Sequence, residues 1–267
     1  MSKPVAFAIA AHPDDIELMM AGTLLLLGQA GYELHYMNIA NGSCGTATDD
    51  RDTIVKRRDA EAREAAKLMG AVFHQPLTDD LDIYYERSAL ARLGAIVRDV
   101  KPAIMLVQSP EDYMEDHMNA CRLAVSAAFC RGLRNFTTDP VRAAISSDVT
   151  VYHALPWGLR GQLRQVIRAG QYVNIGSVLE TKRAALACHK SQKEWLDVSQ
   201  GLDSYLTTME DMARTVGQQI GCFEFAEGWR RHLHLGFCAE DADPLAEALS
   251  THIVTDPYYE SALENSK

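Results

Sequence analysis

Apolar runs and helix-type segments alternate through the first half of the chain. Val5–Ala11 is a continuous apolar run, which is typical of a strand covered on both faces. A helix is predicted from about Ile16 to Gln29, and Gly31 is expected to end it. The same pattern predicts strands over Leu34–Ala40 and Ala103–Val107 and helices over Asp52–Met69, Leu90–Val100 and Asp116–Cys130.

This alternation predicts an α/β fold, Rossmann-like, with a mostly parallel sheet flanked by helices. After Asn135 the pattern becomes more irregular. There we expect strands at Val149–Leu155 and Tyr172–Ile175, helices at Ile175–Lys190 and Leu206–Ile220, and a loop or lid at Pro156–Gly170. We expect one domain over residues 1–267, with a sheet core at about 3–135 and a capping or substrate region at about 136–267.

Charge narrows the classes of partner. The 26 Lys and Arg residues against 36 Asp and Glu residues give a formal net charge of −10. An acidic chain disfavours binding to nucleic acid, which needs a basic face. It also disfavours attachment to an anionic membrane surface.

The apolar stretches and the cysteines indicate the compartment. Val5–Ala11 is too short for the core of a signal peptide, and Leu24–Leu27 is far too short to span a bilayer. None of the six cysteines forms a C-x-x-C pair. We therefore expect a soluble, reduced, cytoplasmic protein without a membrane span.

Candidate chemistry follows the first strand directly. The strand ends at His12-Pro13-Asp14-Asp15, and ligands of open α/β sheets bind beyond the carboxyl ends of strands. His12 and Asp15 offer a nitrogen and an oxygen to Zn²⁺, and His117, in the loop after another inner strand, is the candidate for a third ligand. Asp14 is then a candidate base for a zinc-bound water.

Each of these residues also has a structural interpretation. Asp14 or Asp15 could cap the following helix, and Asp14 with Glu17 fits a capping box. Asp116 could likewise cap the helix that carries His117. The residue pattern alone leaves these alternatives open.

The motifs also resemble a known family. Ala11-His12-Pro13-Asp14-Asp15-Ile16-Glu17 is similar to the signature of the PIG-L/LmbE family of zinc-dependent de-N-acetylases. Arg58-Asp59-Ala60-Glu61, Asp116-His117 and His189-Lys190-Ser191-Gln192 resemble later motifs of that family, in the same order. The resemblance extends from about Val5 to Phe237.

The resemblance implies a function and its residues. The implied activity is zinc-dependent removal of an N-acetyl group from an N-acetylglucosamine-type sugar or glycoconjugate. The implied zinc ligands are His12, Asp15 and His117, with Asp14 as general base. The resemblance further implies that Arg58 holds substrate or acetate and that His189 lies near the pocket.

Met114 departs from the family pattern. Many relatives have a histidine here that stabilises the oxyanion, and methionine cannot donate that hydrogen bond. Arg58, His189 and Tyr113 are the candidate replacements.

Two other functions stay open at this point. One is a zinc-dependent amidase acting on a non-sugar or thiol-conjugate amide, and the other is a metal-containing carbohydrate-binding protein with weak turnover. The resemblance also leaves open a homo-oligomer, as a hexamer or a dimer.

Overall fold

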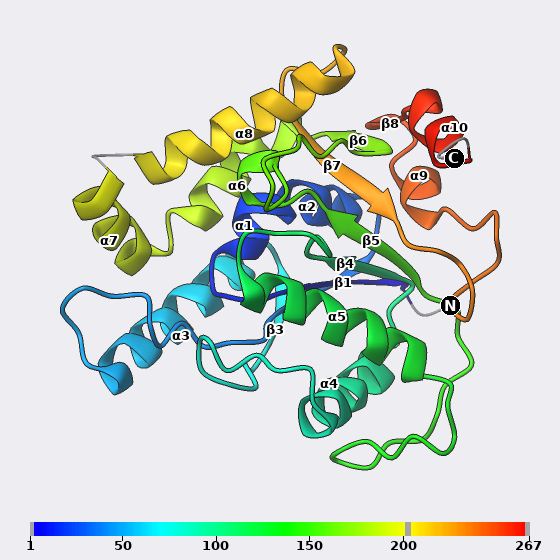
Figure 1. Cartoon of the computed structure of the whole chain (residues 1–267), viewed down its shortest axis with the longest axis horizontal. Helices are drawn as coiled ribbons and strands as arrows, with labels where there is room; N and C mark the ends of the chain where they lie inside the picture. The colour runs from blue at the N-terminus through cyan, green and yellow to red at the C-terminus, as the bar shows by residue number, and fades with distance from the viewer. Residues whose placement is uncertain (1–2, 201–203, 265–267) are drawn as a thin grey trace.

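The computed structural model of the chain describes residues 3–200 and 204–264 (Figure 1). Within these ranges, eight strands form one mixed sheet in the order β3-β2-β1-β4-β5-β7-β6-β8. Their bounds are β1 Val5–Ala10, β2 Glu33–Asn38, β3 Ala71–His74, β4 Ile104–Val107, β5 Thr150–Ala154, β6 Gln171–Asn174, β7 Ala226–Arg231 and β8 Ile253–Thr255.

Helices connect these strands. The α-helices are α1 Asp15–Met19, α2 Ala21–Gln29, α3 Arg51–Leu68, α4 Arg87–Val100, α5 Glu115–Cys130, α6 Leu179–Leu186, α7 Lys190–Gln200, α8 Ser204–Ile220, α9 Pro244–Ala248 and α10 Pro257–Glu264. Two short 3₁₀ turns are η1 Trp157–Leu159 and η2 Gly176–Val178.

Strand β1 has apolar side chains on both of its faces because both faces are covered. Ala6 and Ala8 pack into one core with side chains of α1, α2, α3 and α6. Phe7 and Ile9 point the other way, into a second core with side chains of α4 and α5. Successive strand residues face opposite sides of a sheet, so the uninterrupted apolar run follows from the two-sided cover.

The strand order places the functional loops. β3, β2, β1, β4 and β5 run parallel, and the chain reverses its direction of travel across the sheet between β1 and β4. Loops at such a switch point diverge and leave a crevice at the carboxyl ends of the two strands. The segments after β1 and β4 are those that carry His12 and His117.

The α/β class with a Rossmann-like, mostly parallel sheet is confirmed. The C-terminal half adds β7 antiparallel to β5, and β6 and β8 beyond it. The sheet therefore continues past the core limit expected near residue 135.

Several predicted elements differ in detail. The helix expected over Ile16–Gln29 is two helices, because the chain breaks at Met20, where φ is −134°. The break leaves the N–H groups of Gly22 and Thr23 free to donate to the carboxylate of Glu227, at 2.8 and 2.7 Å. The helix expected over Ile175–Lys190 is divided in the same way into η2, α6 and the start of α7.

All six cysteines are free. No helix within residues 3–200 and 204–264 is both long and apolar enough to cross a membrane.

Candidate metal centre

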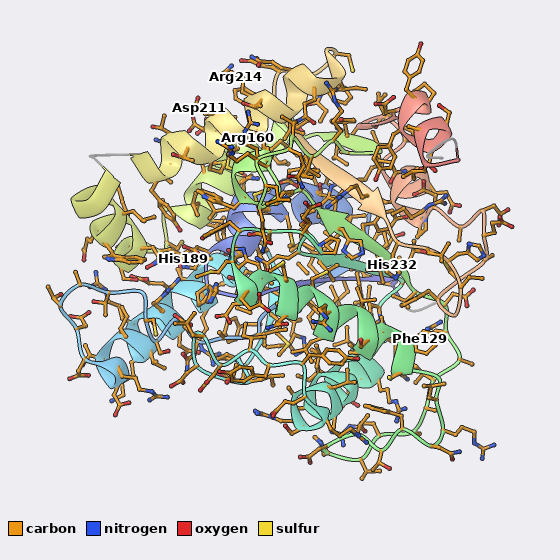
Figure 2. The ribbon with its side chains drawn as sticks, in the orientation of Figure 1. Phe129, Arg160, His189, Asp211, Arg214 and His232 are labelled. Carbon is orange, nitrogen blue, oxygen red and sulfur yellow. The ribbon has the colours of Figure 1, made fainter. Side chains whose placement is uncertain are left out.

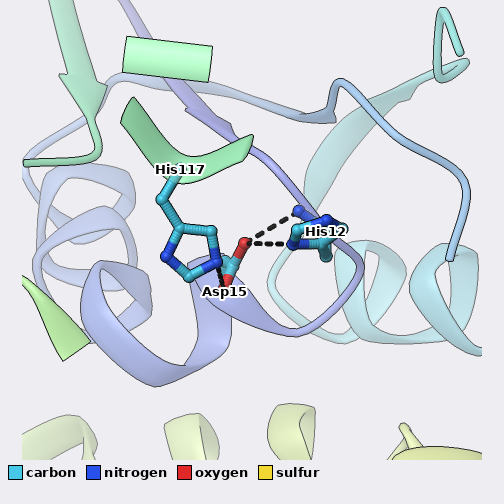
Figure 3. Close-up of side chains that lie close together, drawn as sticks. All are labelled: His12, Asp15 and His117. Carbon is cyan, nitrogen blue, oxygen red and sulfur yellow. Dashed lines mark hydrogen bonds and ion pairs between the residues drawn. The ribbon is translucent and has the colours of Figure 1, made fainter. Parts of the chain in front are cut away.

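Three predicted ligands come together at the switch point (Figure 3). His12 follows β1, Asp15 is the first residue of α1, and His117 lies in the first turn of α5. Each offers one ligand atom, and these atoms lie within 4.8 Å of one another. All three residues are buried.

Asp15 lies between the two imidazoles. Its Oδ2 is 3.5 Å from Nδ1 of His12, and its Oδ1 is 3.4 Å from Nε2 of His117. The backbone N–H of His12 also donates to Oδ2 of Asp15, at 2.8 Å. This bond fixes the carboxylate in the His12-Pro13-Asp14-Asp15 turn, so the two histidines and the carboxylate face a common point.

A carboxylate contacts the outer nitrogen of each histidine. Nε2 of His12 is 2.9 Å from Oδ2 of Asp116, and Nδ1 of His117 is 3.0 Å from Oδ1 of Asp112. Metal-binding histidines almost always have their second ring nitrogen bound in this way, which fixes the tautomer and the orientation of the ring. Two nitrogens and one oxygen form a donor set that suits zinc with a fourth position left for water. The residues present therefore fit a catalytic divalent metal.

The protonation states of the candidate ligands also indicate a site for a cation. Burial lowers the pKa of His12, but hydrogen bonds to Asp116 and Asp15 outweigh it and raise the pKa to about 10. Burial raises the pKa of Asp15, yet the two histidines hold it well below its usual range. With no cation, the protonated imidazoles supply the positive charge that balances the buried carboxylates, and this is the charge that a metal ion brings.

Asp14 has an unusual backbone and a crowded carboxylate. Its φ is 115°, in a region of backbone conformation that residues other than glycine rarely adopt. Its side chain makes no capping hydrogen bond to α1. The capping alternative for Asp14 is therefore wrong, as is the one for Asp116, because α5 begins at Glu115 after Met114. Burial raises the pKa of Asp14 to about 6, although the charge of Arg58 opposes the rise.

Arg58 reaches the same turn from α3. It is 2% exposed, its guanidinium donates to the backbone oxygen of Pro13, and its Nη2 is 3.7 Å from Oδ1 of Asp14. Gly42 and Gly45 pass so close to this guanidinium that a Cβ at either position would overlap it. The loop before α3 therefore packs directly on Arg58.

These residues line a cavity of about 260 Å³. His12, Asp14, Asp15 and His117 form one part of its wall. The remaining lining residues are Leu18, Cys44, Gly45, Arg58, Asp80, Tyr113, Met114, Trp157, Gln192, Trp195, Leu196 and Tyr205.

Tyr113 and His189 occupy different places. Tyr113 lines the cavity, is 59% exposed and lies edge-on to the ring of His117, with ring centroids 5.5 Å apart. His189, labelled in Figure 2, lies fully buried in the turn between α6 and α7. Its Nε2 is 3.2 Å from Oε1 of Glu17, and the cavity lining does not include it. The structure thus brings Arg58 and Tyr113 to the cavity and places His189 behind its wall.

The sequence pattern indicated Asp116 only as part of the Asp116-His117 motif and as a possible helix cap, and it assigned no role to two further neighbours of the site, Asp112 and Tyr205. Asp112 and Asp116 contact the histidines, and the hydroxyl of Tyr205 donates to Oδ2 of Asp14 at 2.8 Å. Only the position of Asp112, five residues before His117, gives a local indication of such a contact. Tyr205 lies 191 residues from Asp14 in sequence, so only the folded chain reveals this contact.

Residues 7–129 match the protein family described as PIG-L: GlcNAc-PI de-N-acetylase. This is the family that the motifs of the chain resemble, and the match confirms that resemblance over these residues. The matched segment runs from β1 to α5 and contains the three candidate ligands.

Two curated relatives carry different activities. A diacetylchitobiose deacetylase of Thermococcus kodakarensis is 27% identical over 232 residues, which are 83% of this chain and 80% of that protein. A 4-oxalmesaconate hydratase of Pseudomonas putida is 29% identical over 197 residues, 70% of this chain and 74% of that protein.

Among solved structures, an N,N'-diacetylchitobiose deacetylase of Pyrococcus horikoshii has a TM-score of 0.71 at 23% identity, covering 90% of this chain and 88% of that chain. The similarity to this solved structure supports the fold of the chain and no more.

Proposed function

We propose that this protein is a zinc-dependent deacetylase that removes the N-acetyl group from an N-acetylglucosamine-type sugar or glycoconjugate. One observation carries the proposal: His12, Asp15 and His117 meet with a carboxylate behind each imidazole, and Asp14 lies in the same cavity. The family match and the deacetylase relative support the same reaction.

His12, Asp15 and His117 would hold the zinc ion. When bound, zinc lowers the pKa of a coordinated water to about 7 and polarises a carbonyl oxygen. The cavity volume of about 260 Å³ suits a small acyl group with part of a sugar.

Asp14 acts as the general base. A pKa near 6 leaves its carboxylate ionised at neutral pH while keeping it basic enough to accept a proton from the attacking water. The same group then returns the proton to the leaving amine, so that acetate and a free amino sugar are released. Arg58, whose guanidinium lines the cavity beside Asp14, holds the acyl group or the acetate product.

Tyr113 is the replacement donor that we propose for the position of Met114. Both residues line the cavity, and the ring of Tyr113 lies edge-on to the ring of His117. His189 is fully buried beside Glu17, and we propose that it acts on Asp14 through charge and not by contact with substrate.

Metal analysis combined with an acetate-release screen tests the proposal. The panel is N-acetylglucosamine, its oligomers and its glycosides, with N-acyl cysteine conjugates as the comparison set. We expect about one zinc per chain and acetate release from at least one sugar, which a chelator abolishes and zinc restores. Release from the cysteine conjugates alone would favour the amidase alternative. Sugar binding without acetate release would favour a carbohydrate-binding protein.

A hydratase is the second candidate. The hydratase relative of Pseudomonas putida, 29% identical over 70% of this chain, favours it. Water activation next to Asp14 would serve the addition of water to a carbon–carbon double bond as well. Loss of the ultraviolet absorbance of an unsaturated dicarboxylate, without acetate release from any sugar, would select this function.

The cytoplasmic location and the homo-oligomer stay predictions. Sedimentation of the purified protein distinguishes a hexamer or dimer from a monomer.

A further inference from the structure

A tyrosine from the C-terminal half of the chain contacts the proposed base. Tyr205 is the second residue of α8, is 2% exposed and lines the cavity. Its hydroxyl donates to Oδ2 of Asp14 at 2.8 Å. No motif of the sequence points to this residue.

The two carboxylate oxygens of Asp14 have different surroundings. Oδ2 accepts the hydrogen bond from Tyr205, whereas Nη2 of Arg58 lies 3.7 Å from Oδ1. That separation is longer than a hydrogen bond, and the same Nη2 already donates to the backbone oxygen of Pro13. In the part of the chain that the structure describes, no hydrogen bond reaches Oδ1, so this oxygen keeps its full capacity to accept a proton, whereas Oδ2 already accepts one hydrogen bond.

We propose that Tyr205 is a positioning residue: it fixes the carboxylate of Asp14 through Oδ2, so that Oδ1 is the oxygen that accepts the proton from the attacking water. The inference rests on the proposed function, because it assigns the acceptor atom of the same base.

Two physical arguments support this assignment. The terminal torsion of an aspartate is broad, so a carboxylate without an anchor samples many orientations. A hydrogen bond from a hydroxyl to a carboxylate is charge-assisted and about twice as strong as a neutral one, so it selects one orientation. Misplacement of a reacting group by about 1 Å costs about 10²-fold in rate. Removal of the hydroxyl should therefore affect turnover more than substrate binding.

The test is Tyr205→Phe, which removes the hydroxyl and keeps the ring. We expect kcat for acetate release to fall about 10- to 100-fold, with KM and the zinc content within about twofold of the wild type. A kcat within twofold of the wild type overturns the proposal. A loss of zinc, or a rise in KM equal to the fall in kcat, also overturns it, because each indicates a structural effect.

Tyr152→Phe is the matched control. Tyr152 on β5 is also fully buried and donates to a carboxylate, Oδ1 of Asp243, at 2.7 Å, but it does not line the cavity. Its substitution should lower the melting temperature and leave kcat unchanged. A similar fall in kcat in both variants would assign the effect to general destabilisation and overturn the proposal.

A second measurement does not depend on activity. The melting temperatures of the wild type, Tyr205→Phe, Asp14→Gly and the double variant form a thermodynamic cycle. Glycine suits the positive φ at position 14 and removes the carboxylate. We expect Tyr205→Phe to lower the melting temperature in the wild type and to have little effect in Asp14→Gly. Equal effects in both backgrounds overturn the contact itself. If the wild type releases no acetate, the proposed function fails, and this cycle still decides whether Tyr205 anchors Asp14.

Discussion

At the scale of the residue, Asp14 raises the free energy of the folded state in two ways. Its backbone has a φ of 115°, which costs about 1–3 kcal/mol for a residue other than glycine. Its carboxylate is buried, which disfavours the charged form and raises its pKa. Strain and burial of this kind concentrate at functional sites, where the surrounding structure maintains them.

Asp14→Asn should therefore keep the metal and lose turnover. Asparagine tolerates the same backbone conformation but cannot accept the proton, so kcat should fall by about 10²- to 10⁴-fold. Metal analysis and acetate release measure the two effects on one preparation. His117→Ala is the comparison variant and should lose both metal and activity. Full activity in Asp14→Asn would exclude Asp14 as the base.

Asp112→Asn should weaken metal binding although Asp112 is not a ligand. Asp112 contacts Nδ1 of His117 at 3.0 Å, and such partners change metal affinity by about 10–100-fold. A competition titration with a chromogenic chelator measures this change. Asp99→Asn is the control, because Asp99 pairs with Arg142 on the surface and should leave affinity unchanged. Equal affinities in both variants would contradict the assigned contact.

At the scale of the element, the break between α1 and α2 depends on a buried ion pair. Nζ of Lys182, on α6, is 2.6 Å from Oε1 of Glu227, and both side chains are almost fully buried. The carboxylate of Glu227 also accepts the N–H groups of Gly22 and Thr23 at the start of α2. Nζ of Lys182 also donates to the backbone oxygen of Leu18 in α1, at 3.0 Å, so the ion pair links α1 to α2, the two helices that follow the candidate metal-binding turn.

Lys182→Met should lower the free energy of unfolding by about 3–5 kcal/mol, because it leaves the buried carboxylate of Glu227 without its cation. Denaturant titration measures the change. Lys67→Met removes an exposed lysine, 3.7 Å from Glu64, and should change the free energy by less than about 0.5 kcal/mol. Similar changes in the two variants would contradict the structural role of the buried pair.

The elements also show what the sequence could predict. Strands β1 and β4 are recognisable because both of their faces are buried and their residues are apolar. Strand β7 contains Glu227, Arg230 and Arg231 and was not predicted, because the partners that neutralise Glu227 are far away in the sequence. The candidate metal ligands follow predicted strands, so the local pattern was enough to suggest them, whereas Tyr205 contacts Asp14 only through the packing of α8.

At the scale of the whole molecule, a buried histidine and a half-buried one link β5 to the segment after β7. Nε2 of His153 is 2.9 Å from Nδ1 of His232, which Figure 2 labels. Burial lowers the pKa of His153 to about 4, and that of His232 below its usual value. Protonation of either group therefore opposes folding.

This pair predicts a loss of stability in mild acid. The unfolded chain binds a proton at His153 below about pH 6.5, and the folded chain does so only near pH 4. Stability is therefore lost as the pH falls from about 6.5 to 4, by up to about 3 kcal/mol. Denaturant titrations across this range, with chelator present throughout, should show a shallower pH dependence for His153→Gln than for the wild type. Parallel pH profiles would contradict the assignment.

The position of the site along the chain has a consequence for its assembly during synthesis. His12, Asp15 and His117 all lie within the first 117 residues, whereas Tyr205 belongs to α8 and β7 inserts beside β5 later still. A nascent chain can thus contain every candidate metal ligand before Tyr205, the neighbour of Asp14, has been synthesised. A chain interrupted before α8 would contain all three candidate ligands and lack the hydroxyl that contacts Asp14.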